Sequence, residues 1–457
     1  MPPALQRSWL TLRELALTFG PFIALALLLV GLAYHWLQPA PPRHVVLATG
    51  IAQGAYAGFG ARYAELLAAH GITVELRATQ GAADNLALLR DAASGVDIAF
   101  VQGGADELAQ AGVAAAAEPA DDGLQSLGRM FHEPVWLFYR DAAARQRLGQ
   151  GRGATLGRLP QLAGWRVNVG APGSGGPPLF MRLLALNGVE PAALQLSQLP
   201  TTPAVVELLE GRLDALLLVS APESPMVQML LRTPGIGLVD WSQAEAYARR
   251  LPFLTPVVLP RGVVDLARDL PPTDLHGMAP TASLVARESL HPALVQLFMQ
   301  AAQQVHGGAG WFQRKGEFPN AGDTERALAP EAARFYRSGT PWLQRWLPFW
   351  LANLADRMWV VLLAIVAVLI PLSRVLPPLL EYRIRSRVFR WYGRLRVVEE
   401  AQAAGQRPLS ELLAELDAIE AGVSQVHMPL SHTDALYALR SHIQLVRRRL
   451  QAGAKAQ

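Results

Sequence analysis

Cysteine is absent from this sequence of 457 residues, and charged residues are scarce. Without cysteine the chain forms no disulfide, no thiolate metal site and no cysteine nucleophile. Only 17% of the residues are Asp, Glu, Lys or Arg, whereas 51% are hydrophobic. Lysine occurs only at Lys315 and Lys455, and the net charge is +4. This small net charge gives no reason to expect nucleic-acid binding, and the apolar excess predicts membrane segments.

The signatures of common enzyme classes are missing as well. The sequence has no P-loop, no kinase signature and no HExxH, and its 10 histidines are scattered without acidic partners at metal-ligand spacing. The loop GAPGSGG at 170–176 contains Ser174, but it lacks the GxSxG spacing of a nucleophile elbow. We therefore expect no enzymatic activity, no metal and no cofactor. The remaining enzyme hypothesis, an envelope hydrolase, requires turnover that disappears in Ser174→Ala.

Two apolar segments are predicted to span a membrane. Residues 15–37 carry no Asp, Glu, Lys or Arg and follow a short N-terminal segment, 1–14. A cleaved signal peptide is the alternative, but the run is long and has no small-x-small site before Pro41. The second predicted span covers 355–378, for which a buried core helix is the alternative.

The segment that follows the second predicted span indicates a topology. Residues 383–396 contain arginines and no acidic residue, a composition that marks the cytoplasmic side and attracts anionic lipid. We therefore predict a protein of the bacterial inner (plasma) membrane with both termini in the cytoplasm. Residues 38–355 are then periplasmic or extracellular.

Strands and helices alternate between the two predicted spans. The expected strands are 44–49, 72–79, 96–102, 136–139, 165–170, 194–199 and 213–220. This alternation predicts parallel sheets and an α/β fold in two lobes. The first lobe is expected over 40–140, the second over 141–250, and the chain returns to the first over 251–340. Two lobes joined by crossing strands form a clam-shell of the periplasmic-binding-protein type, with a ligand cleft between them.

Glycine-rich loops follow strands at corresponding places in the two lobes, at 50–54 and 173–176. Loops that open helices present free N–H groups and a positive dipole end to an anion, so the two loops together predict an anion site. The alternative is that these glycines only form tight turns. A dinucleotide site is disfavoured because GAYAGFG lacks the compact spacing and the acidic residue that follows it. For Trp136 and Tyr139 we prefer a core role to a place in the cleft.

Five motifs in this order resemble a known family: TGIAQGAYAGFG, RATQGAADNLALL, GVDIAFVQGG, GWRVNVGAPGSGG and ELLEGRLDALLLVSAPESP. Over residues 44–310 the chain resembles the TAXI family of solute-binding proteins, which serve tripartite TRAP-type transporters. The resemblance implies that the protein captures a glutamate-like amino acid or another small carboxylate for membrane permease subunits. Some positions depart from the family pattern: Ala82, Gly103, Gly104 and Gly176 replace hydroxyl or carboxylate residues. The ligand-binding residues that the motifs and loops indicate are Thr49, Gly50, Gly54, Tyr56, Thr79, Asn85, Gln102, Gly173, Ser174 and Gly175.

The C-terminal segment, 397–457, is predicted to form a cytoplasmic helical hairpin. Residues 408–426 place leucine, isoleucine and valine on one helical stripe, and a second amphipathic helix follows. Two such helices bury little alone, so we expect them to pair and then to form a homodimer or dock on a partner. Delivery to a permease needs no such tail. The second functional hypothesis is therefore a tethered ligand receptor, or an interaction protein of a membrane complex, that acts through these helices.

Overall fold

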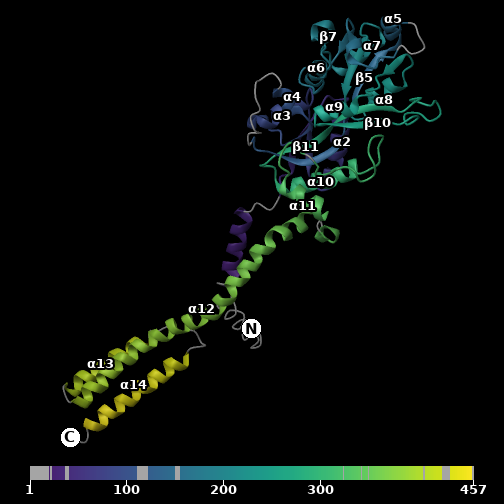
Figure 1. Ribbon diagram of the computed structural model, residues 1–457. Helices are drawn as coiled ribbons and strands as arrows, with labels where there is room; N and C mark the ends of the chain where they lie inside the picture. The colour runs from purple at the N-terminus through teal and green to yellow at the C-terminus, as the bar shows by residue number, and fades with distance from the viewer. Residues whose placement is uncertain are drawn as a thin grey trace. The chain divides into compact units, whose positions relative to one another are not determined.

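The computed structural model divides into two compact units, Ala40–Asn353 and the combination of Met1–Pro39 with Leu354–Gln457 (Figure 1). The residues that the structure describes are 20, 23–36, 41–110, 122–149, 155–322, 324–340, 342–347, 349–404, 407–424 and 433–454.

The first sheet of the unit Ala40–Asn353 is mixed. Its parallel part consists of β1 (His44–Gly50) between β2 (Thr73–Ala78) and β3 (Ile98–Gln102). The long strand β11 (Leu275–Arg287) runs antiparallel to β3, β4 (Leu124–His132) and β10 (Leu254–Leu259). The prediction of a parallel sheet is therefore wrong for the pairs that β11 forms with β3, β4 and β10. These pairs are antiparallel because β11 returns from the second lobe and enters the sheet in the opposite direction.

Helices enclose the core of this first lobe. The aromatic side chains of Phe59, Tyr63, Phe100 and Phe298 are almost completely buried, together with aliphatic residues of β1 and β11. The helices of the lobe are α2 (Ala55–Ala68), α3 (Ala82–Arg90), α4 (Ala105–Gln110), α10 (Pro292–His306) and α11 (Pro330–Ser338).

The second lobe has a five-stranded sheet of the order β7-β6-β8-β5-β9. β6 (Arg166–Asn168) is parallel to β7 (Gln195–Ser197) and β8 (Ala215–Val219), whereas β5 (Val135–Arg140) is antiparallel to β8 and β9 (Ile236–Leu238). The two-lobed α/β fold is thus confirmed, with mixed sheets. The helices of this lobe are α5 (Asp141–Leu148), α6 (Gly176–Leu186), α7 (Thr201–Leu209), α8 (Pro225–Arg232) and α9 (Ala244–Arg250).

Trp136 and Tyr139 belong to the core of the second lobe. The indole N–H of Trp136 donates to the carbonyl of Ser220 at 2.8 Å, and its ring stacks on Phe138. Tyr139 is 4% exposed and lies in the hydrophobic cluster that contains Trp165. Neither residue lines the cleft.

The chain crosses between the lobes at two places that touch each other. Glu133 and Pro134 connect β4 to β5, and β11 pairs with β10 at its start and with β3 and β4 further on. The backbone N–H of Glu133 donates to the carbonyl of Pro280 at 2.9 Å, so the two crossings are joined by a hydrogen bond.

Strand β4 was not expected from the sequence. Its segment, LQSLGRMFH, is buried at every position except one, so the alternation that marks a half-buried strand is missing. Within the returning segment, residues 281–306 divide into the end of β11 and the helix α10, which begins at Pro292. Proline suits the first position of a helix, because its missing N–H has no intrahelical partner there.

The second unit contains a helix over residues 23–36 and the helices α12 (Phe349–Ala404), α13 (Leu409–Ser424) and α14 (Thr433–Ala454). α13 and α14 pair as predicted, and Leu395 and Val398 of α12 complete their core. The tail is therefore a three-helix cluster rather than a two-helix hairpin. Its fully buried side chains include Leu416, Ile419 and Ile443.

None of the helices described here combines the length and the apolar character needed to cross a membrane. The spans predicted at 15–37 and 355–378 are therefore not found among the residues that the structure describes. Part of the first span and the N-terminal segment 1–14 lie outside the described residues.

Candidate functional site: a cleft between the two lobes

A cleft of about 110 Å³ opens between the lobes. This volume is below the ~300–1,000 Å³ of most ligand pockets, so the closed cleft suits only a small molecule. The cleft lies at the carboxyl ends of β1, β3 and β6, where ligands bind in open α/β sheets. Its polar lining includes Thr49, Tyr56, Gln80, Gln102 and Glu133 of the first lobe side and Ser174, Thr201, Ser220 and Ser224 of the second.

Three helices begin at the cleft without a capping side chain. Their N-caps are Gly54 for α2, Gly81 for α3 and Gly175 for α6. A glycine has no side chain that could accept a hydrogen bond from the first N–H groups of the helix. Each helix start carries partial positive charge and N–H groups without intrahelical partners. Because residues of all three starts line the cleft, the arrangement favours an anionic group there. In α6 the donors are limited to Gly175 and Gly176, because the next two residues are prolines.

The two lobes touch across the cleft. The backbone N–H of Asp84, in the first turn of α3, donates to the carbonyl of Gly173 at 3.3 Å. The hydroxyl of Thr202 donates to the Gln53 amide oxygen at 2.9 Å. The glycine loop of the second lobe therefore bonds to the first lobe directly, and the structure is that of a closed clam-shell.

The structure separates the predicted ligand-binding residues into two groups. Thr79, Asn85 and Gly173 do not line the cleft. The Thr79 hydroxyl donates to the Asn85 Oδ1 at 2.6 Å, and the Asn85 Nδ2 donates to the carbonyl of Phe100 at 2.8 Å. Asn85 is completely buried, so it ties the start of α3 to β3. The residues that line the cleft are Thr49, Gly50, Gly54, Tyr56, Gln102, Ser174 and Gly175.

Gln102 is only 3% exposed, and its Nε2 has no hydrogen-bond partner among the described residues. Its amide lies so close to Gly175 that a Cβ there would stand 2.2 Å from the Gln102 Oε1. A buried donor without a partner costs about 1–3 kcal/mol. A ligand acceptor in the cleft would satisfy this donor. By contrast, the Ser174 hydroxyl already donates to the carbonyl of Ala171 at 2.7 Å.

Glu133 is a cleft residue that the sequence did not indicate. It is 3% exposed, and its Oε2 accepts a hydrogen bond from the Tyr56 hydroxyl at 2.8 Å. Burial raises the pKa of the Glu133 carboxyl to about 8, and burial together with the neighbouring Glu133 raises that of the Tyr56 phenol well above its usual value. The available signal was an acidic residue followed by Pro134 at the start of an apolar strand.

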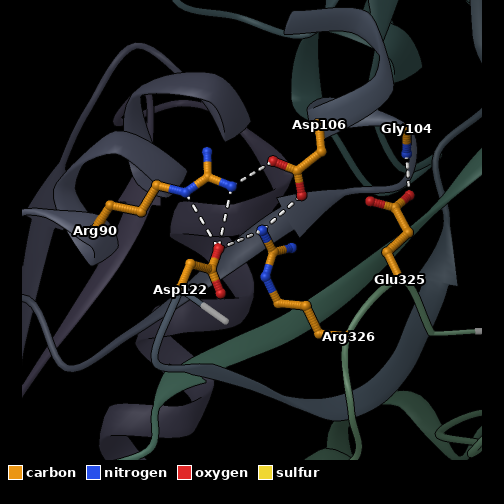
Figure 2. A network of polar contacts seen from close by, with 6 residues as sticks. All are labelled: Arg90, Gly104, Asp106, Asp122, Glu325 and Arg326. Carbon is orange, nitrogen blue, oxygen red and sulfur yellow. Dashed lines mark hydrogen bonds and ion pairs between the residues drawn. The ribbon is translucent and has the colours of Figure 1, made fainter. Parts of the chain in front are cut away.

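A second cavity lies in the first lobe beside a network of ion pairs. Arg326 contacts Asp106 at 2.6 Å and Asp122 at 3.1 Å, and Arg90 contacts the same two carboxylates at 2.7 and 3.1 Å (Figure 2). Arg326 and Glu325 line the cavity, and Glu325 accepts a hydrogen bond from the Gly104 N–H. The cluster joins α3, α4 and the segment before α11, and it stabilises the first lobe.

The fold and the cleft define the chain as a two-lobed α/β protein of the periplasmic solute-binding type. The chain belongs to the NMT1-like family, whose model matches residues 47–336.

No curated protein matches the sequence. Similar solved structures include MatC from Rhodopseudomonas palustris with bound malate, at 16% identity and a TM-score of 0.39, covering 71% of this chain and 100% of that one. The alkanesulfonate-binding protein SsuA from Xanthomonas axonopodis pv. citri, bound to MOPS, is 14% identical with a TM-score of 0.37, covering 58% and 74%. PhnD1 from Prochlorococcus marinus (MIT 9301), in complex with methylphosphonate, is 12% identical with a TM-score of 0.36, covering 58% and 84%.

Proposed function

We propose that this protein binds a small organic anion, a carboxylate or a glutamate-like amino acid, by closing its two lobes over it. The observation that carries the proposal is the meeting of three uncapped helix starts, those of α2, α3 and α6, in one cleft. The partnerless Nε2 of Gln102 adds a side-chain donor. An anion held in this way needs no arginine or lysine, and neither is found among the described residues of the cleft lining.

A thermal-shift screen of the purified full-length chain tests this function. The panel consists of small carboxylates, amino acids, sulfonates and phosphonates, each at high concentration. A ligand at ~100 times its dissociation constant stabilises the folded protein by about 2.7 kcal/mol, which raises the melting temperature measurably. If the folded protein responds to no member of the panel, the proposed function is wrong.

We further propose that the bound solute is passed to a permease of the TRAP type, as the resemblance to the TAXI family implies. The corresponding location is the outer side of the bacterial plasma membrane for Ala40–Asn353, with both termini in the cytoplasm. Reporter fusions placed after residue 353 and after residue 457 test the location. Fluorescence of a cytoplasmic reporter at the first site, or activity of a periplasmic reporter at the second, contradicts it.

The second candidate function is a receptor or docking protein that acts through its tail. It is favoured by one observation: α12, α13 and α14 share a hydrophobic core of their own. Pairs of cysteines can be introduced, one in α12 and one in the helix over 23–36. Because the chain has no cysteine of its own, any cross-link forms between the introduced pair. Cross-linking that changes when ligand is added supports the receptor function, and unchanged cross-linking supports delivery alone.

A further inference from the structure

We infer that the ligand is a small zwitterion, a carboxylate that also carries a protonated nitrogen, and that Glu133 binds its ammonium group. This inference rests on the proposed binding function and narrows its ligand class. It assigns two tasks to the cleft: the helix starts bind the carboxylate, and Glu133, beside the start of α2, binds the cation.

The charges of the cleft support this assignment. Among the described residues that line it, Glu133 is the only one with a carboxyl group, and no arginine, lysine or histidine accompanies it. A second ligand carboxylate beside this buried acid would leave Glu133 protonated and make no ion pair with it, because two like charges are costly in a buried site. An ammonium group would supply the counter-charge that the protein does not provide.

The hydrogen bonds leave Glu133 ready to bind a cation. Tyr56 donates to Oε2, whereas Oε1 accepts no hydrogen bond from the described residues. Tyr56 is also the second residue of α2, whose start faces the cleft. The same residue therefore connects the anion-binding helix start to the carboxyl group.

Glu133 also lies where the lobes join. Its backbone N–H donates to Pro280 of the second crossing. An ion pair at this position forms beside the hinge and becomes desolvated as the lobes close, which strengthens it. Binding energy at Glu133 is thereby linked to closure.

Ligand binding is coupled to the protonation of the Glu133 carboxyl. In the ligand-free protein burial raises the pKa of Glu133 to about 8, so the carboxyl is mostly protonated at pH 7. When the ammonium group arrives, Glu133 gives its proton to the solvent and becomes the carboxylate of the ion pair. Below pH 8, binding therefore releases close to one proton per ligand, and affinity increases by ~tenfold for each pH unit.

The experiment compares amino acids with their deaminated counterparts on the full-length chain. The probe pairs are L-glutamate with glutarate, L-alanine with propionate and 4-aminobutyrate with butyrate, measured by calorimetry between pH 6 and 8. We expect the preferred amino compound to bind about 30-fold or more tightly than its counterpart, because the counterpart forms no ion pair with Glu133. Calorimetry in two buffers of different ionisation enthalpy measures the released proton.

Glu133→Gln keeps the hydrogen bond to Tyr56 and removes the charge. We expect the variant to lose both the preference for the amino compound and the proton release. Glu325→Gln is the control, because Glu325 is a glutamate whose pKa is also raised by desolvation but which does not line the cleft. Thermal unfolding of both variants verifies that they are folded.

The outcomes separate the two proposals. If glutarate, propionate or butyrate binds as tightly as its amino counterpart, or if Glu133→Gln keeps the preference, the inference about Glu133 is overturned and the binding function stands. If no probe binds to the folded wild-type protein, the binding function falls, and the inference falls with it.

Discussion

Gly81 and Ser174 lie in contact across the cleft. A Cβ added to Gly81 would stand 3.0 Å from the Cα of Ser174, so the loop before α3 meets the loop before α6 backbone to backbone. The neighbouring hydrogen bond from the Asp84 N–H to the Gly173 carbonyl joins the same two parts of the chain. Closure of the two lobes therefore depends on the absence of a side chain at residue 81.

Gly81→Ala should weaken ligand binding by ~10- to 100-fold, because overpacking of a contact costs about 1–3 kcal/mol. Gly95→Ala is the control: Gly95 also has a positive φ, of 69°, but no atom lies within 4 Å of an added Cβ. Calorimetry on both variants separates lost closure from backbone strain. Equal affinities for the two variants would contradict the role of Gly81 in closure.

Gln102 and Asn85 should respond differently to alanine. Gln102→Ala removes the partnerless amide of the cleft, so we expect ligand affinity to fall by about 1–3 kcal/mol. Asn85→Ala breaks the hydrogen bonds to Thr79 and Phe100, so the free energy of unfolding should fall by a similar amount. Denaturant unfolding of the ligand-free variants and titration with ligand distinguish the two effects. A stable Asn85→Ala protein that no longer binds ligand would place Asn85 in the site.

Glu133→Gln should change how stability depends on pH. The folded pKa of Glu133, about 8, lies above its unfolded value of ~4.3, so its contribution to stability is complete below pH ~4.3 and is lost as the pH rises to 8. The wild-type protein should therefore lose ~1.4 kcal/mol of unfolding free energy per pH unit in this window, relative to the variant. Urea unfolding at several pH values measures the difference. A constant difference from pH 4.5 to 8 would show that Glu133 does not titrate there.

His306 should produce the opposite dependence at acidic pH. Its ring stacks on Phe131 at 5.0 Å between centroids and meets Phe59 edge-on, and burial, with a contribution from Arg62, lowers its pKa to about 3. Because the unfolded value is ~6.5, the stabilisation is present above pH 6.5 and is lost as the pH falls towards 3.

His306→Phe should keep the stacking and remove this titration. We expect the variant to retain more of its stability than the wild type between pH 6.5 and 4, by ~1.4 kcal/mol per pH unit. Thermal unfolding over this range provides the measurement. Parallel curves for the two proteins would mean that His306 is not protonated on unfolding.

The tail offers a pair of glycines for a test of its three-helix core. A Cβ on Gly422 of α13 would stand 2.2 Å from the ring of Trp391 of α12, whereas one on Gly393 of α12 meets nothing within 4 Å. Gly422→Ala should destabilise the tail by about 1–3 kcal/mol, since the indole must move. Gly393→Ala should stabilise it by up to ~1 kcal/mol, because alanine favours helix. Circular dichroism during thermal unfolding of both variants tests the prediction; a stabilising Gly422→Ala would mean that α13 does not pack on Trp391.

Most strands and helices that alternate along the chain were predictable, because their patterns are local. The strands near residues 44–49 and 96–102, for example, are short apolar runs bounded by turn residues, and the structure has β1 and β3 there. The helix stripe that predicted α13 is also local. The strand β4 was not predictable, because both of its faces are buried and its direction is set by β11, which lies about 150 residues further along the chain.

The sequence by itself determined the two glycine-rich loops and the helices that they open, since glycine and the residues after it act within one turn. It also determined the pairing of α13 with α14 through their apolar stripes. Only the tertiary structure decided which polar groups meet in the cleft. Tyr56 and Glu133 are 77 positions apart, and no local pattern relates them. They meet because the β4–β5 crossing passes beside the start of α2, and burial at that crossing raises the pKa of the Glu133 carboxyl in the cleft.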